Sequence, residues 1–172
     1  MSVQVCESGV TFGDFGAADV FLVEQAVAQV QLSNAGVKSV EFILRQEVSG
    51  TAVINLVEAK SSLPRDSTAF FGDIRQKMLH SLAVWFCAVV GRHAALKPLL
   101  PEHQRSIKVL NLPLRLVLVV PKAPDASLPQ LTDLFRRAMV ADRTSWAIDH
   151  SAILVLNESR AIKYGLIAQV VT

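Results

Sequence analysis

The chain has 172 residues, which is enough for one domain with a substantial hydrophobic core. Its composition is 51% hydrophobic and only 19% charged, so we expect a partner or a second copy to cover part of its surface. A formal net charge of +2 gives no strong overall field for nucleic acid, and such binding would need a local basic patch. The two cysteines and four histidines show no metal-ligand spacing, which argues against a zinc site.

The hydropathy pattern predicts neither a membrane span nor a targeting segment. The longest strongly apolar run covers residues 82–91, whereas a transmembrane helix needs roughly 20 such residues. Residues 1–13 lack the basic start and apolar stretch of a signal peptide. We therefore expect no membrane contact and a cytoplasmic location.

The first part of the chain is predicted to hold a short strand or ordered arm followed by a helix. Glycines recur between Met1 and Ala18 among two phenylalanines, which favours the strand or arm. Asp19 can cap a helix that runs to about Leu32, and Asn34 to Gly36 would end it. The helix is indicated by apolar residues at three- and four-residue spacing: Val20, Val23, Val27 and Val30.

A β-hairpin is predicted next, with strands over residues 40–48 and 51–60. Ser49-Gly50 is a pair suited to a tight two-residue turn, and that turn places Glu41 opposite Glu58. Because side chains alternate along a strand, Glu41, Glu58 and Lys60 would project from one face. The hairpin would therefore gather two carboxylates and a lysine in a small volume.

Two carboxylates that face each other across a ladder repel, and a divalent cation would explain their placement. Mg²⁺ prefers hard oxygen ligands, which Glu41, Glu58 and the carbonyl of Ala59 could supply. Lys60 could then orient or deprotonate an attacking water, or stabilise charge at a phosphorus atom. The alternative is that these residues are ordinary strand ends, because E-x-K is a frequent pattern.

The rest of the chain alternates helices and strands. A loop over residues 61–68 leads into a long helix, with Ser67 or Thr68 as its cap and an apolar stripe that covers the sheet. The later elements are predicted as a buried strand over 114–120, a helix over 127–140, a buried strand over 152–156, a helical turn over 159–163 and a terminal strand over 166–171. This order predicts a single α/β domain over residues 1–172, with a mixed central β-sheet flanked by helices.

The order of elements and the acids they carry resemble the PD-(D/E)xK nuclease superfamily over about residues 19–93. The resemblance places Glu41, Glu58 and Lys60 in the motif positions and implies a restriction-endonuclease-like αβββαβ core. One departure is that the first acid is a glutamate after Val40, where the family usually has an aspartate, often after a proline. The third strand of the core would be residues 10–15 or be missing.

The resemblance also implies roles for residues outside the hairpin. A helical glutamate often joins the metal site in this family, which suggests Glu24; the alternative is a surface glutamate beside Gln25. Gln76 and His80 partly match a Q-x-x-x-Y motif that contacts the substrate backbone, so Gln76 would position substrate. Lys77 is a further candidate phosphate contact.

The function expected from this resemblance is a Mg²⁺- or Mn²⁺-dependent endo- or exonuclease that hydrolyses DNA, or RNA, through a metal-activated water. Nucleic acid, DNA first, would be the partner, and the chain would form a homo-oligomer or a subunit of a larger complex. The alternative is a catalytically inactive module of the same fold that binds nucleic acid or a protein. A third hypothesis is an α/β protein of unassigned function, in which the acids of the hairpin match the motif by coincidence.

Overall fold

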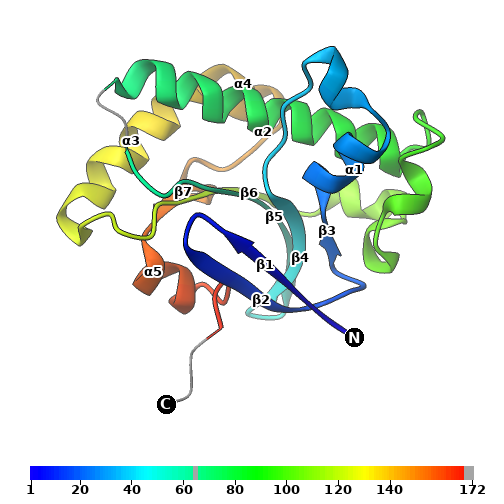
Figure 1. The fold of residues 1–172 in the computed structure, drawn as a ribbon, viewed down its shortest axis with the longest axis horizontal. Coiled ribbons are helices and arrows are strands. Elements are labelled where there is room, and N and C mark those ends of the chain that lie inside the picture. The colour runs from blue at the N-terminus through cyan, green and yellow to red at the C-terminus, as the bar shows by residue number, and fades with distance from the viewer. Residues whose placement is uncertain (64–65, 169–172) are drawn as a thin grey trace.

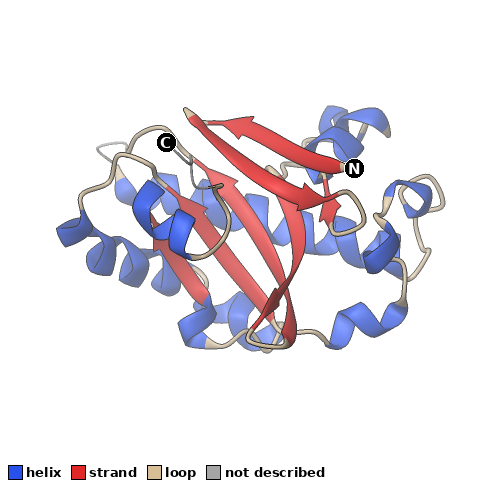
Figure 2. Ribbon diagram, turned by 90° about the horizontal axis from the view of Figure 1, so that it is seen from below, coloured by secondary structure: helices blue, strands red, loops and turns tan. Residues whose placement is uncertain are grey.

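The computed structural model describes residues 1–63 and 66–168, which form a five-stranded sheet, a separate two-stranded sheet and flanking helices (Figures 1 and 2). The strands are β1 (Ser2–Glu7), β2 (Val10–Gly16), β3 (Val20–Phe21), β4 (Phe42–Val48), β5 (Thr51–Ala59), β6 (Leu114–Val119) and β7 (Ile153–Leu156). The α-helices are α1 (Val23–Gln29), α2 (Ser67–Val89), α3 (Leu128–Ala138), α4 (Val140–Ser145) and α5 (Glu158–Lys163).

The five-stranded sheet has the order β3-β4-β5-β6-β7 and mixes both kinds of pairing. β3, β4 and β5 pair antiparallel, whereas β6 and β7 continue the sheet parallel to β5. Parallel neighbours need a crossover, and α2 and α3 supply the two crossovers. The predicted α/β class, with a mixed sheet flanked by helices, is confirmed.

The central hairpin has the predicted turn and register. β4 and β5 pair without interruption from Val48↔Thr51 to Phe42↔Val57. Ser49 and Gly50 both have positive φ, 50° and 79°, as a type I′ turn requires, and this twist matches that of the flanking strands. The ladder ends at Phe42, so Glu41 lies one residue before it rather than as a paired residue opposite Glu58.

Each face of the large sheet is covered by a different layer. Helices α1, α2 and α3 pack on one face against Ile54, Leu56 and their neighbours in β6. The β1–β2 hairpin and α5 pack on the other face, against Phe42, Val57 and Val119 (Figure 1). Side chains of β5 therefore alternate between two apolar layers, which explains its nearly continuous burial.

Several details of the first forty residues differ from expectation. α1 begins at Val23 instead of Asp19, and it has no side-chain cap. Asp19 instead accepts from Arg45 at 3.4 Å and pairs with His103 at 2.8 Å. The third antiparallel strand of the sheet is Val20–Phe21, which precedes α1, so these core elements run β3-α1-β4-β5-α2-β6. The candidate over residues 10–15 is a strand, but it belongs to the two-stranded sheet.

Two further predictions concern ends of elements. The predicted cap of α2, Ser67 or Thr68, is wrong: Asp66 caps the helix, and its carboxylate accepts from the amides of Thr68 and Ala69 at 2.9 and 3.1 Å. The loop before it includes residues 64–65, which lie outside the described part of the chain. The predicted terminal strand over 166–171 falls partly outside it as well, and Ile167 forms one isolated bridge with Phe12.

The β7 edge of the sheet is closed by side chains of α3. The amide of Val155 donates to the hydroxyl of Thr132 at 3.2 Å, and Arg136 donates to the carbonyl of Ile153 at 3.2 Å. Such capping disfavours addition of a further strand at this edge. Among the described helices, none has the length and apolar character needed to cross a membrane.

Candidate metal centre

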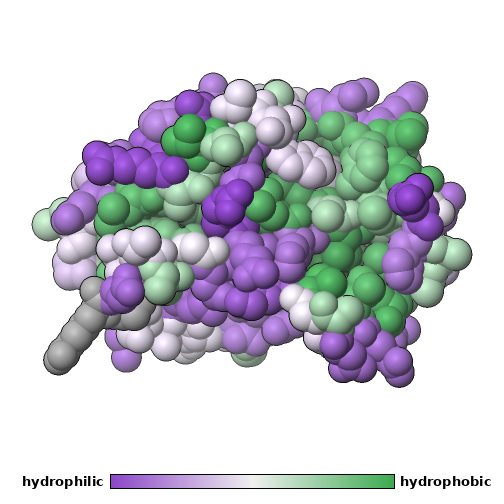
Figure 3. Space-filling view, turned by 90° about the horizontal axis from the view of Figure 1, so that it is seen from above, coloured by the Kyte–Doolittle hydropathy of each residue, from purple (hydrophilic) through white to green (hydrophobic). Residues whose placement is uncertain are grey.

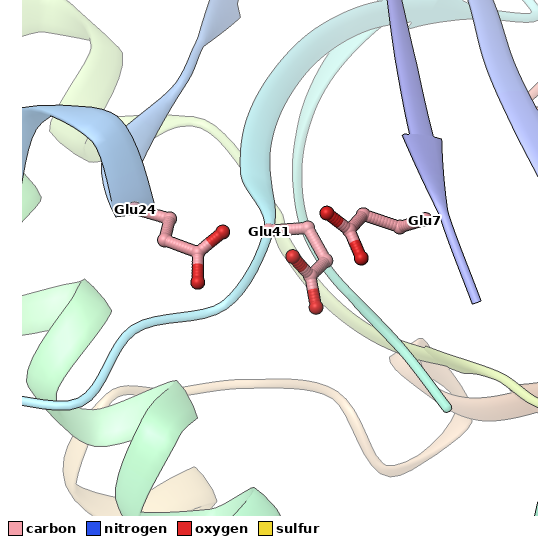
Figure 4. Close-up of side chains that lie close together, drawn as sticks. All are labelled: Glu7, Glu24 and Glu41. Atoms are coloured by element: carbon pink, nitrogen blue, oxygen red, sulfur yellow. The ribbon is translucent and has the colours of Figure 1, made fainter. Parts of the chain in front are cut away.

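The carboxylates predicted from the sequence lie at the end of the large sheet where β5 and β6 finish and β4 begins. The amide of Lys60 donates to the carbonyl of Val119 at 2.9 Å, which holds the chain after β5 against the end of β6. The carboxyl ends of neighbouring parallel strands meet at this edge, a common location for sites in α/β sheets. The last residue of β1 and the first turn of α1 reach the same place (Figures 1 and 4).

The segment that carries Glu41 is held by hydrogen bonds to α2 and β5. The amide of Lys38 donates to Nδ1 of His80 at 3.0 Å, and the amide of Val40 donates to Oγ of the buried Ser81 at 2.9 Å. The amide of Glu41 donates to the carbonyl of Val57 at 3.0 Å. His80 therefore orients the chain that leads to Glu41.

Three glutamates from three elements converge around Glu41. Carboxylate oxygens of Glu7, Glu24 and Glu41 all lie within 4.8 Å of one another, and Figure 4 shows Glu41 between the other two side chains. Glu41 is buried, Glu7 is half-buried and Glu24 is exposed. The cluster is thus open to solvent on the α1 side and closed on the side of the sheet.

Glu58 lies beside this cluster and is held by two lysines. Its side chain has no solvent exposure, and its Oε1 accepts from Nζ of Lys60 at 2.8 Å and from Nζ of Lys77 at 2.7 Å. The other oxygen, Oε2, is buried and has no hydrogen-bond partner among the described residues. A buried carboxylate oxygen without a donor is costly, so this atom is free to accept a proton, a donor or a cation.

The crowding of acids changes their protonation. Burial raises the pKa of Glu41 to about 8, and the negative charges of Glu58, Glu24 and Glu7 add to this effect. Burial also raises the pKa of Glu58, although Lys77 and Lys60 oppose it. Burial lowers the pKa of Lys77, but the charge and hydrogen bond of Glu58 outweigh it, so the net pKa of Lys77 is raised.

The structure brings most of the sequence-predicted residues together. Glu24, Glu41, Glu58 and Lys60 meet at one end of the sheet. Ala59 ends β5 with its side chain in the opposite apolar layer, and coordination by its carbonyl stays a prediction.

Gln76 is exposed, and helix geometry turns it about 100° away from Lys77, its neighbour in sequence. The residue of α2 that reaches the carboxylates is therefore Lys77, and substrate contact by Gln76 stays a prediction.

Glu7 was not found by sequence reasoning, because no motif marks it and 34 positions separate it from Glu41. Lys77 was proposed only as a phosphate contact. A signal for its inward position existed, since Lys77 lies three residues after Ile74 and four before Ser81, both of them buried. A charged residue on the apolar stripe of a helix needs a buried partner, which here is Glu58.

The donor set suits a hard divalent cation. All the candidate side-chain ligands are carboxylates, whose hard oxygen atoms suit Mg²⁺ and Mn²⁺ better than softer metals. Oxygens on opposite sides of one Mg²⁺ lie about 4.2 Å apart, so the 4.8 Å spread of the three glutamates needs only small side-chain movements. If all four carboxylates are ionised, they carry two more charges than the two lysine amines that contact Glu58, and one divalent cation would balance this excess.

Comparison of the chain with protein-family models, with curated proteins and with solved structures finds no match.

Proposed function

We propose that the chain is a Mg²⁺- or Mn²⁺-dependent nuclease that hydrolyses phosphodiester bonds of DNA or RNA. The observation that carries the proposal is the unpartnered, buried Oε2 of Glu58 beside the cluster of Glu41 and Glu24, with Lys60 in contact with the same carboxylate. A buried carboxylate oxygen without a donor, beside a second buried acid, is a costly arrangement for a purely structural site.

Glu41, Glu58 and Glu24 would hold the cation, with the carbonyl of Ala59 as a further oxygen ligand. The bound cation would supply an activated water and would neutralise charge on the phosphate. The ionised form of Glu41 is the ligand form. Because the pKa of Glu41 is about 8 without a cation, binding must compete with a proton near neutral pH.

Lys60 and Lys77 would receive the phosphate. Both amines now donate to the same oxygen of Glu58, and a phosphate oxygen can replace that acceptor without loss of a hydrogen bond. The side chain of Lys60 is 31% exposed and that of Lys77 is 17% exposed, so Lys60 is nearer to the solvent from which substrate arrives. We therefore assign to Lys60 the contact with the attacking water or the reacting phosphate.

Hydrolysis joins a water oxygen to phosphorus and breaks the bond between phosphorus and the leaving sugar oxygen. The water loses one proton and the leaving oxygen gains one, so no oxidant or further reactant is needed. Two amines near the phosphate would stabilise the charge that grows on its oxygens as the bond breaks.

The test is cleavage by the full chain of end-labelled duplex DNA, single-stranded DNA and RNA, each with Mg²⁺, Mn²⁺ or chelator. We expect cleavage of at least one substrate with either cation and none with chelator. Lys60→Ala should lower the rate by about a hundredfold or more, while Lys122→Ala, at an exposed turn, should not. No cleavage of any substrate with either cation, in protein that is folded, would overturn the proposal.

The second candidate is a non-cleaving module that binds nucleic acid or a protein partner. It is favoured by apolar surface on the helical side of the molecule, which Figure 3 shows toward the right of the view. Phe86, Val90 and Ile107 are 40%, 37% and 64% exposed. Such a surface fits the expected oligomer or larger assembly. Light scattering that gives a monomer over a wide concentration range would count against a homo-oligomer.

A further inference from the structure

The N-terminal β1–β2 hairpin is anchored to the large sheet through β2. Phe12 and Phe15 are buried and pack against Phe42 of β4, edge-on and tilted, with their ring centroids 5.3 and 5.4 Å from that of Phe42. The amide of Gly13 donates to the carbonyl of Leu166 at 3.2 Å. β1 instead alternates between exposed and half-buried side chains, and within residues 1–63 and 66–168 its one partner strand is β2. The outer strand is therefore the less firmly held half of the hairpin.

Glu7 is the last residue of β1, beside the turn at Ser8 and Gly9, and its carboxylate points toward Glu41 (Figure 4). No hydrogen bond or ion pair joins this carboxylate to another of residues 1–63 and 66–168. Its nearest charged neighbours of the cluster are two further acids, Glu24 and Glu41. Whenever these acids are ionised, they repel one another, and in the cation-free protein the end of the hairpin is then repelled from the sheet.

A second observation that points to a ligand is the buried Oε2 of Glu58, beside this cluster. It belongs to a side chain with no solvent exposure, it has no donor among the described residues, and Glu58 is close enough to Glu41 to act on its charge. A cation among these acids would turn the repulsion of Glu7 into attraction.

We infer that Glu7 is an additional ligand of the divalent cation, so that the ion latches the outer strand of the N-terminal hairpin to the central sheet. The inference rests on the proposed metal site, but it adds a ligand and a structural consequence. The two sheets would be joined along β2 by Phe12 and Phe15 and at the end of β1 by the ion. Cation binding would then order β1, and loss of the hairpin contact would weaken cation binding.

The test is calorimetric titration of the full chain with Mn²⁺, with Glu7→Gln, Glu41→Gln and Asp14→Asn as variants. Asp14→Asn is the matched control, because Asp14 lies in the same hairpin and its carboxylate contacts Gln4. We expect Glu41→Gln to abolish binding, Glu7→Gln to weaken it about tenfold or more, and Asp14→Asn to leave it unchanged. Circular dichroism confirms that each variant is folded.

Hydrogen exchange gives a second readout that does not depend on affinity. Saturating Mn²⁺ should slow exchange of β1 amides in the wild-type protein and in Asp14→Asn, but not in Glu7→Gln. If Glu41→Gln loses binding while Glu7→Gln keeps full affinity and the slowed exchange, the role of Glu7 is refuted and the metal site stands. If the wild-type chain binds no Mn²⁺ at all, the metal site fails and the latch fails with it.

Discussion

Two hairpins of this protein have the same kind of turn but differ in how extensively they pack against the rest of the molecule. Ser8-Gly9 and Ser49-Gly50 both have positive φ, at 52° and 83° in the first pair and 50° and 79° in the second. The β4–β5 hairpin pairs without interruption and is enclosed by two apolar layers. The β1–β2 hairpin has a register shift between Val3 and Val5, and its outer strand is largely exposed.

This difference teaches that turn chemistry forms a hairpin, while packing decides where it lies. The same two-residue turn occurs at the tip of a central hairpin and of a peripheral one. What places the peripheral hairpin is the burial of Phe12 and Phe15 against Phe42. The β1–β2 hairpin brings Glu7 to one end of the large sheet, the β4–β5 hairpin brings Glu41 and Glu58, and the candidate site lies where the two hairpins meet.

The largest effect is expected from a substitution that removes the packing of the peripheral hairpin on the sheet. Phe12 has no solvent exposure, and Phe12→Ala should lower the free energy of unfolding by about 3–5 kcal/mol. It should also weaken Mn²⁺ binding, because Glu7 would lose its position. Denaturant unfolding measures the first effect, and Val3→Ala, in the half-buried outer strand, should cost much less. Equal losses for the two variants would show that Phe12 does not anchor the hairpin.

A second experiment compares adjacent residues of α2. Lys77 contacts Glu58 and Gln76 is exposed, so Lys77→Met should lower the cleavage rate by about 10–100-fold and Gln76→Ala by little. Lys77→Arg should restore part of the rate, since it keeps the charge. The single-turnover rate at saturating Mg²⁺ is the quantity to measure. The reverse order of effects would return Gln76 to the role that the sequence suggested.

The pH dependence of stability tests the central hairpin. The pKa of Glu41 is about 8 in the folded protein and near 4.5 when unfolded, so the folded state holds a proton that the unfolded state releases. Stability should therefore be greatest below about pH 4.5 on this account and fall as pH rises to 8. Glu41→Gln should remove this slope and stabilise the cation-free protein by about 1–3 kcal/mol at pH 8.

Chemical denaturation with chelator at pH 5 and pH 8 provides the measurement. Glu102→Gln, at an exposed position, should keep the wild-type slope. Identical pH dependence for Glu41→Gln and the wild-type chain would mean that Glu41 is ionised in the folded protein.

The smallest expected effect tests whether the two turns have the same geometry. Ser8→Asn and Ser49→Asn each place Asn-Gly in a type I′ turn, the favoured pair for this geometry. Each should raise the free energy of unfolding by about 0.5 kcal/mol, and the effects should add because the turns are independent. Thermal unfolding of the single and double variants measures these changes. A decrease in stability for either single variant would show that its serine makes contacts beyond the turn.

Local patterns were sufficient to predict the central hairpin and its register, since turn chemistry and alternation act between near neighbours. The apolar stripe of α2 and the aliphatic run of β6 were equally readable. Glu7, the two-residue β3 and the true start of α1 were missed, because each depends on packing between segments distant in sequence. Asp19 is a residue type that often caps helices, but here its carboxylate is bonded to Arg45 and His103 instead.

The most direct test of the metal site is crystallography of the full chain soaked with Mn²⁺, using its anomalous scattering. We predict a single strong peak among the carboxylates of Glu7, Glu24, Glu41 and Glu58, with Oε2 of Glu58 turned to the ion. A well-ordered site with no peak at saturating Mn²⁺, and with Glu58 still bonded to Lys60 and Lys77 alone, would contradict it.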